Sequence, residues 1–169
     1  MNKRTDVLNY LEGLGGNILC LQETHWVERD LCSIKNLWKG DCFINGSKSN
    51  SRGVAILLKP NFEYSVSNVS ANDEGNLLSI DITLNDTSLK IINAYAPNTD
   101  SPQYFKNIEN HIATSQTDYI LLSGDLNVTL DPKLDCDNYK HINNPRARNV
   151  LREIIDKHNL SDIFRKLHP

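Results

Sequence analysis

Apolar residues occur along the chain in short periodic stretches that predict a mixture of helices and strands. Helical spacing of apolar side chains predicts a helix over residues 5–14, which the glycine pair at 15–16 ends. Short apolar runs predict five strands, at residues 17–22, 53–58, 77–84, 89–95 and 119–122. Two later helices are expected over residues 104–112 and 150–155, and Asn159 would cap the second.

Polar residues between these elements give further detail. Asn85-Asp86 predicts a hairpin turn between the third and fourth strands. Ser79, Asp81 and Thr83 alternate with apolar residues, which predicts a sheet with one wetter face. Residues 124–144 are polar and predict a loop. Without internal repeats, this mixture predicts one α/β domain of layered sheets, in which Tyr119–Leu122 is a buried strand.

Composition limits the class of protein. The 169 residues carry a formal net charge of -3, so the net charge does not indicate a basic face that binds nucleic acid. A local basic rim is nevertheless compatible with a negative net charge. No apolar run approaches the roughly 18 residues needed to cross a bilayer. The cysteines match no zinc pattern, and we interpret them as reduced thiols of an intracellular protein. They are Cys20, Cys32, Cys42 and Cys136.

Three of the predicted strands end in polar residues. Glu23 follows the first strand, residues 95–98 follow the fourth, and residues 125–127 follow the fifth. Strand ends are where α/β sheets collect ligands and chemistry. We therefore expect these three clusters to converge on one rim.

The residue types in these clusters suit phosphodiester hydrolysis. Mg²⁺ takes one or two carboxylates plus water and phosphate, which a single well-placed Glu23 can supply. Asp125 can accept a proton from an attacking water, while the Asn127 amide and the Tyr95 phenol can hold a phosphate. Each residue also has an ordinary structural interpretation. Glu23 can be an exposed acid, Asp125 and Asn127 can form an Asx turn, and Tyr95 can be a half-buried sheet tyrosine. His25 and Arg52 can contact a phosphate backbone or be solvated surface.

Four short motifs occur in the order and approximate spacing of one protein family. They are Leu21-Gln22-Glu23-Thr24, Arg52-Gly53-Val54-Ala55-Ile56-Leu57, Asn93-Ala94-Tyr95-Ala96-Pro97-Asn98 and Gly124-Asp125-Leu126-Asn127. The chain resembles the exonuclease–endonuclease–phosphatase superfamily, and most of all the apurinic-type endonuclease domain of non-LTR (LINE-type) retrotransposon polyproteins. The segment 160–165 with His168-Pro169 resembles the one that follows the last helix in the retrotransposon branch.

The resemblance implies an α/β fold, a four-layered sandwich of two mixed sheets face to face with outer helices. It implies an endonuclease that uses Mg²⁺, or alternatively Mn²⁺, to nick duplex DNA with water as nucleophile, leaving a 3′ hydroxyl. In retroelements that hydroxyl primes reverse transcription. A reverse transcriptase domain in the parent polyprotein and a nuclear location are therefore expected.

The resemblance also implies residue roles. Glu23 matches the metal-binding glutamate, and Tyr95 matches the tyrosine near the scissile phosphate. Asp125 matches the residue proposed as base or leaving-group acid, and Asn127 matches its phosphate-orienting partner. Two further positions that touch the DNA backbone in relatives are His25 and Asn98.

Both ends of the family pattern are absent from the sequence. The pattern begins with a strand that carries a site Asn, and it closes with a later Asp and a Ser-Asp-His ending. We therefore expect residues 1–169 to form a single, partial domain without its first strand and its C-terminal catalytic strands. Because catalytic groups act as a unit, we expect this polypeptide to be inactive alone.

Two other functions remain open at this point. A phosphatase or phosphodiesterase acting on a non-DNA phosphate ester would share the metal site, so Glu23 and Asp125 do not separate it from a nuclease. A non-catalytic remnant would keep the sandwich without its chemistry. The retroelement-like segment 162–169 favours DNA as the substrate.

Overall fold

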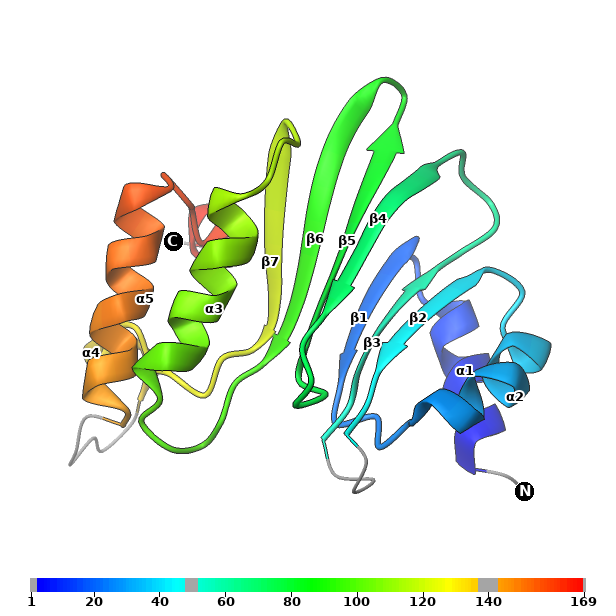
Figure 1. The fold of residues 1–169 in the computed structure, drawn as a ribbon, viewed down its shortest axis with the longest axis horizontal. Helices are drawn as coiled ribbons and strands as arrows, with labels where there is room; N and C mark the ends of the chain where they lie inside the picture. Colours follow the sequence, from blue (N-terminus) through cyan, green and yellow to red (C-terminus); the bar gives the residue numbers. More distant parts are fainter. Residues whose placement is uncertain (1–2, 48–51, 137–142, 169) are drawn as a thin grey trace. The chain divides into compact units, whose positions relative to one another are not determined.

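The computed structural model describes residues 3–47, 52–136 and 143–168, and the chain divides into two compact units. The first unit comprises Met1–Tyr95 with Gln116–Asp125, and the second comprises Ala96–Ser115 with Leu126–Pro169. The strands of the described residues all lie in the first unit, in two separate sheets (Figure 1).

The first sheet is antiparallel, with the strand order β1-β3-β2. Its strands are β1 (Ile18–Gln22), β2 (Asp41–Asn45) and the fully buried β3 (Val54–Leu58). The helical segments before and between them are α1 (Lys3–Gly13), η1 (Glu28–Asp30) and α2 (Leu31–Leu37). Apolar residues of α1 and α2 pack on one face of this sheet in a cluster that includes Leu8, Leu11, Ile34, Trp38, Ala55 and Leu57.

The second sheet has the strand order β4-β5-β6-β7. Its strands are β4 (Ser65–Ala71), β5 (Leu77–Leu84), β6 (Thr87–Tyr95) and β7 (Tyr119–Asp125). Neighbouring strands are antiparallel except β6 and β7, which run parallel. Asn85 and Asp86 join β5 to β6 with φ angles of 44° and 67°, as a two-residue hairpin turn requires.

The two sheets of the first unit pack face to face. Alternate side chains of β3 point to opposite faces, so one set meets α1 and α2 while the other meets the second sheet. That second set shares a cluster with residues of β5 and β6, composed of Val54, Ile56, Leu58, Leu78, Ile80, Ile82 and Ile91. The interface between the sheets is therefore the apolar core that sets the spacing of the strand ends.

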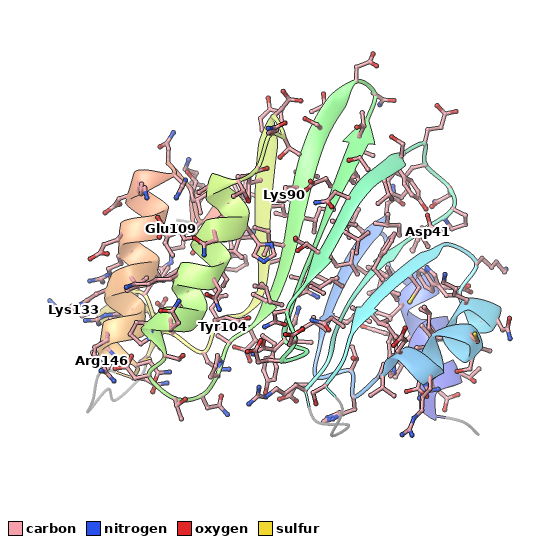
Figure 2. All side chains as sticks on the ribbon, viewed as in Figure 1. Asp41, Lys90, Tyr104, Glu109, Lys133 and Arg146 are labelled. Atoms are coloured by element: carbon pink, nitrogen blue, oxygen red, sulfur yellow. The ribbon has the colours of Figure 1, made fainter. Side chains whose placement is uncertain are left out.

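The second unit is helical and consists of α3 (Pro102–Ala113), α4 (Pro132–Asp135), α5 (Pro145–Lys157) and α6 (Ile163–Leu167). Helices α3 and α5 pack against each other. Asp100 caps α5, because its carboxylate accepts from Ala147 N at 2.8 Å and pairs with Arg146, which Figure 2 labels. No helix among the described residues is long and apolar enough to cross a membrane.

The structure corrects several predicted elements. Strands β2 and β4 and helix α2 lie where no element was expected, and α4 lies within the predicted loop 124–144. Helix α6 follows the helix that was expected to be the last. The first sheet is wholly antiparallel, whereas two mixed sheets were expected. Three of the four predicted layers lie in the first unit: the helices α1 and α2 and the two sheets.

Burial also differs from expectation on two strands. Ser79 on the predicted wet face is 0% exposed, so that face of β5 is covered at this position. The predicted buried strand 119–122 is part of β7, where Tyr119 and Leu121 are 65% and 41% exposed. The difference arises because β7 is an edge strand in the described residues, and an apolar run alone does not reveal an edge position.

Candidate functional site

Three of the predicted site residues come together at strand ends of the first unit. Glu23 follows β1 directly, Tyr95 ends β6, and Asp125 ends β7. The parallel register of β6 and β7 pairs Tyr95 with Asp125. The Tyr95 hydroxyl donates a hydrogen bond to Glu23 Oε1. An acid, a phenol and a second acid from three separate strands therefore share one edge of the sandwich.

The surroundings of Tyr95 raise the pKa of its hydroxyl. The hydrogen bond to Glu23 is the main cause that raises the Tyr95 pKa above its ordinary value, followed by burial and by the negative charges of Glu23 and Asp125. The positive charge of Arg52 acts in the opposite direction, and its side chain is exposed. Tyr95 is thus a hydrogen-bond donor at neutral pH and not a nucleophilic phenolate.

The backbone turns sharply around Glu23. Glu23, His25 and Arg52 have φ angles of 53°, 54° and 67°, a left-handed conformation that costs energy outside glycine. Hydrogen bonds fix this turn: Thr24 N donates to Gly53 O at 3.1 Å, and His25 N donates to Arg52 O at 2.8 Å. The turn ends β1 and leaves the Glu23 and His25 side chains exposed.

Gly53 makes the close approach of this turn possible. Its φ is 97°, and a Cβ at this position would lie 2.6 Å from Thr24 Oγ1 and 3.0 Å from His25 N. Its own N–H donates to Gly75 O at 3.1 Å. The glycine therefore ties the turn after Glu23 to the connection between β4 and β5.

The β4–β5 connection holds Tyr95 by its backbone. Tyr95 N donates to Asn76 O at 2.8 Å. The Asn72 side chain shapes this connection, since its Oδ1 accepts from Asn76 N at 3.2 Å and from Leu77 N at 3.1 Å. No role was predicted for Asn72 and Asn76. The turn-forming composition of residues 72–76 between two strands was the available signal.

The other two predicted residues near the strand ends, Asn98 and Asn127, belong to the second unit. Asn127 Nδ2 donates to Ala96 O at 2.7 Å. The buried Asn144 joins both residues, because its Nδ2 donates to Asn127 O at 2.9 Å and to Asn98 O at 3.4 Å. Within this unit the Asn144 side chain thus joins the segments that carry Asn98 and Asn127, through the main-chain carbonyls of these two residues.

The donor set of the first unit fits a hard divalent cation. Glu23 and Asp125 are exposed carboxylates, and Mg²⁺ prefers one or two carboxylates plus water and phosphate oxygens. Among the described residues, no group of three or more His, Cys, Asp or Glu side chains is arranged to hold a metal ion. The four cysteines are free thiols, and burial raises the pKa of Cys20 and Cys42 to about 11, which keeps these two protonated.

Comparison with known proteins agrees with this architecture. The chain is 29% identical over 166 residues to the "Transposon TX1 uncharacterized 149 kDa protein" of Xenopus laevis. The aligned region covers 96% of this chain and 12% of that protein. An AP endonuclease from Archaeoglobus fulgidus matches with a TM-score of 0.61 at 23% identity, over 92% of this chain and 65% of the other. The 3′-5′ exonuclease NExo from Neisseria meningitidis gives a TM-score of 0.64 at 17% identity, over 89% and 64% of the two chains.

The two packed sheets form an α/β fold that these two nuclease structures share. The sequence model of the Endonuclease/Exonuclease/phosphatase family matches residues 1–160, and the chain belongs to this family. The resemblance predicted from the four motifs is confirmed, including the likeness to a transposon protein. The chain spans about an eighth of that relative and under two thirds of the two solved structures.

Proposed function

We propose that this chain is the nuclease domain of a transposon-type polyprotein, which hydrolyses phosphodiester bonds in duplex DNA with Mg²⁺ or Mn²⁺. The observation that carries the proposal is the Tyr95–Glu23 hydrogen bond beside Asp125 at the ends of three strands. Membership of the family and the nuclease names of the matched structures support hydrolysis of phosphate esters. The transposon relative supports DNA as the substrate.

The residues divide the work according to their chemistry. Glu23 would hold the cation, which when bound neutralises phosphate charge and makes a coordinated water more acidic. Asp125 accepts the proton of the attacking water, or returns one to the leaving oxygen. The Tyr95 hydroxyl, whose one hydrogen bond goes to Glu23 in this structure, would turn to donate to a phosphate oxygen as charge develops there. Asn127 orients the phosphate.

Two further residues would bind the DNA backbone, His25 and Asn98. Their contacts with phosphates position the duplex without reading its sequence. Cleavage would leave a 3′ hydroxyl, from which a reverse transcriptase domain of the same polyprotein extends a new strand. This role would place the parent protein in the nucleus.

Nicking of supercoiled plasmid DNA tests the proposal, with the chain expressed in its full reading frame. We expect Mg²⁺-dependent nicking, which chelation stops. Glu23→Gln should abolish nicking, because the amide cannot replace the charge of the metal ligand. Glu28→Gln is the matched control, since Glu28 is exposed and lies outside the site. Absence of nicking with either metal, or normal nicking by Glu23→Gln, contradicts the proposal.

The same preparations distinguish the alternative substrates. Turnover of soluble phosphate esters in place of duplex DNA would assign the site to the phosphatases of the family. Calorimetry that detects neither Mg²⁺ nor Mn²⁺ binding would identify a non-catalytic remnant.

A further inference from the structure

An amide side chain lies in the apolar core between the two sheets. Asn93, two residues before the end of β6, is 0% exposed and lies between the buried residues Ile92 and Ala94 in the sequence. Its Nδ2 donates to Leu21 O on β1 and to Ala55 O on β3, both at 2.9 Å. These carbonyls belong to a residue pair of the first sheet, so the side chain crosses from one sheet to the other.

A second amide completes this connection. Gln22, the last residue of β1, donates from Nε2 to Asn93 Oδ1 at 2.6 Å. Both donors and one acceptor position of the Asn93 amide are therefore satisfied. A buried amide contributes directionality that an aliphatic residue cannot supply, because its hydrogen bonds exist in one strand register only. We call Gln22 and Asn93 the amide clasp.

The clasp lies next to the candidate site along both strands. Gln22 immediately precedes Glu23, and Asn93 precedes Tyr95 by two residues, on the same face of β6. The backbone of Tyr95 is bound to Asn76 of its own sheet, whereas the clasp binds β6 to the strand that carries Glu23. The relative position of the Glu23 carboxylate and the Tyr95 hydroxyl thus depends on a contact between the sheets.

We propose that Gln22 and Asn93 are positioning residues of the site: their cross-sheet hydrogen bonds hold β1 and β6 at the spacing where Tyr95 donates to Glu23. This inference rests on the proposed function, in which Glu23 holds the cation. The clasp itself touches neither cation nor DNA. It acts through Glu23, whose left-handed backbone at φ 53° persists because the surrounding structure fixes it.

Asn93→Leu tests the clasp, because leucine keeps the shape and burial of the side chain and removes its hydrogen bonds. Four quantities are measured on the chain in its full reading frame: Mn²⁺ affinity by calorimetry, kcat and KM for plasmid nicking, and Tm. Loss of groups that orient a metal ligand usually costs about 10- to 100-fold in metal affinity or activity. We expect a loss of that size in Mn²⁺ affinity and kcat, with KM for DNA unchanged.

Trp38→Phe is the matched control. The buried Trp38 indole donates to Leu58 O at 3.0 Å, a carbonyl at the other end of β3, so the variant also loses a buried hydrogen bond to this strand. It should lower Tm without changing Mn²⁺ affinity. Equal Mn²⁺ affinities and kcat values in Asn93→Leu and Trp38→Phe would show that the clasp has only a structural role.

Gln22→Leu keeps the test decisive if Asn93→Leu does not fold. This variant removes one hydrogen bond and leaves the two from Asn93 to the first sheet in place. We expect Mn²⁺ affinity and kcat to fall, by less than in Asn93→Leu. Unchanged Mn²⁺ affinity and kcat overturn the inference. If the wild-type protein neither binds Mn²⁺ nor nicks DNA, the proposed function fails. If it does both and the clasp variants match it, only the positioning role fails.

Discussion

The Tyr95 hydroxyl donates a hydrogen bond to the Glu23 carboxylate although 72 positions separate the two residues in the sequence. Glu23 follows a strand of the three-stranded sheet, and Tyr95 ends a strand of the four-stranded sheet. The contact therefore exists only when the two sheets are packed. The bond raises the Tyr95 pKa further above its ordinary value, and the protonated phenol is a donor at neutral pH.

Replacing Tyr95 by phenylalanine separates the role of the phenol from that of the carboxylate. We expect Tyr95→Phe to lower the single-turnover rate of DNA nicking by about 100-fold, the order expected when one donor to a developing oxyanion is lost. Its Mn²⁺ affinity should stay close to that of wild type, because Glu23 is retained. Tyr119→Phe, at the exposed start of β7, is the matched control. A normal rate for Tyr95→Phe would exclude the phenol from the chemistry.

The elements that the sequence predicts well have strong local signals. The β5–β6 hairpin combines β-branched apolar residues with Asn85-Asp86, whose types tolerate the left-handed turn. Helix α3, predicted over residues 104–112, buries Tyr104, Phe105, Ile108 and Ile112 at helical spacing. Asn159, the predicted cap of α5, has a φ of 50° and follows the C-cap residue His158.

The elements that were missed have weak local signals. Strand β4 reads Ser-Val-Ser-Asn-Val-Ser-Ala, and as an edge strand it buries little of either face. Its pairing with β5 determines its conformation, and a sequence pattern does not contain that pairing. Strand β2 is only five residues long and is likewise an edge strand, next to the fully buried β3.

The residues of the candidate site likewise differ in how well the sequence predicts them. The positions of Glu23, Tyr95 and Asp125 were predictable, because each follows or ends an apolar run at a strand terminus. The clasp was not, although an asparagine inside the run Ile91-Ile92-Asn93-Ala94 is an unusual choice for a core. Its partners are Leu21 O and Ala55 O, which only the packing of the sheets reveals.

Gly53 should be intolerant of any side chain. The φ of 97° and the 2.6 Å approach to Thr24 Oγ1 both oppose a Cβ, so we expect Gly53→Ala to lower the free energy of unfolding by at least about 1–3 kcal/mol. Urea denaturation measures this loss. Gly13→Ala is the control, since a Cβ at Gly13 meets nothing within 4 Å and alanine favours the helix. Equal stability of Gly53→Ala and wild type would contradict the strained turn after Glu23.

The ion pair between Lys90 and Asp81 should behave as a buried pair. Lys90 on β6 faces Asp81 on β5. The Lys90 side chain, labelled in Figure 2, is 6% exposed, and the Asp81 side chain is 17% exposed. Lys90→Met leaves the Asp81 charge unpaired, so we expect a loss of about 3 kcal/mol in urea unfolding, the lower end for a broken buried pair.

A double variant tests the coupling of this pair. Lys90→Met with Asp81→Val should recover most of the loss, since two apolar side chains suit a β-strand and leave no charge unpaired. The exposed pair Lys157–Glu109 provides the contrast, because Lys157 is 66% exposed and Lys157→Met should cost under about 1 kcal/mol. Additive losses in the Lys90–Asp81 double variant would show that the charges do not interact.

Asp118 should make the first unit sensitive to acid. Its carboxylate accepts from Ser88 Oγ at 2.7 Å and from Ser88 N at 2.8 Å, which joins the start of β7 to the start of β6. The Ser88 hydroxyl, with its backbone N–H, lowers the Asp118 pKa below the ordinary value. A depressed pKa in the folded state means that the carboxylate stabilises the fold above its unfolded-state pKa of about 3.9. That contribution is lost as the pH falls through the lower folded-state value.

The Tm of Asp118→Asn, measured from pH 7 down to pH 2.5, checks this sign. We expect the variant to melt below wild type at pH 7. The difference in Tm should begin to shrink below about pH 4 and should close as the pH falls through the lower folded-state pKa of Asp118. In a Ser88→Ala background, Asp118→Asn should lower Tm by a smaller amount over the same pH range, because Ser88→Ala removes the hydroxyl that lowers the Asp118 pKa. Asp156→Asn on the exposed surface of α5 controls for the change of net charge. A difference in Tm that stays constant with pH would mean that Asp118 stabilises the strand starts without its charge.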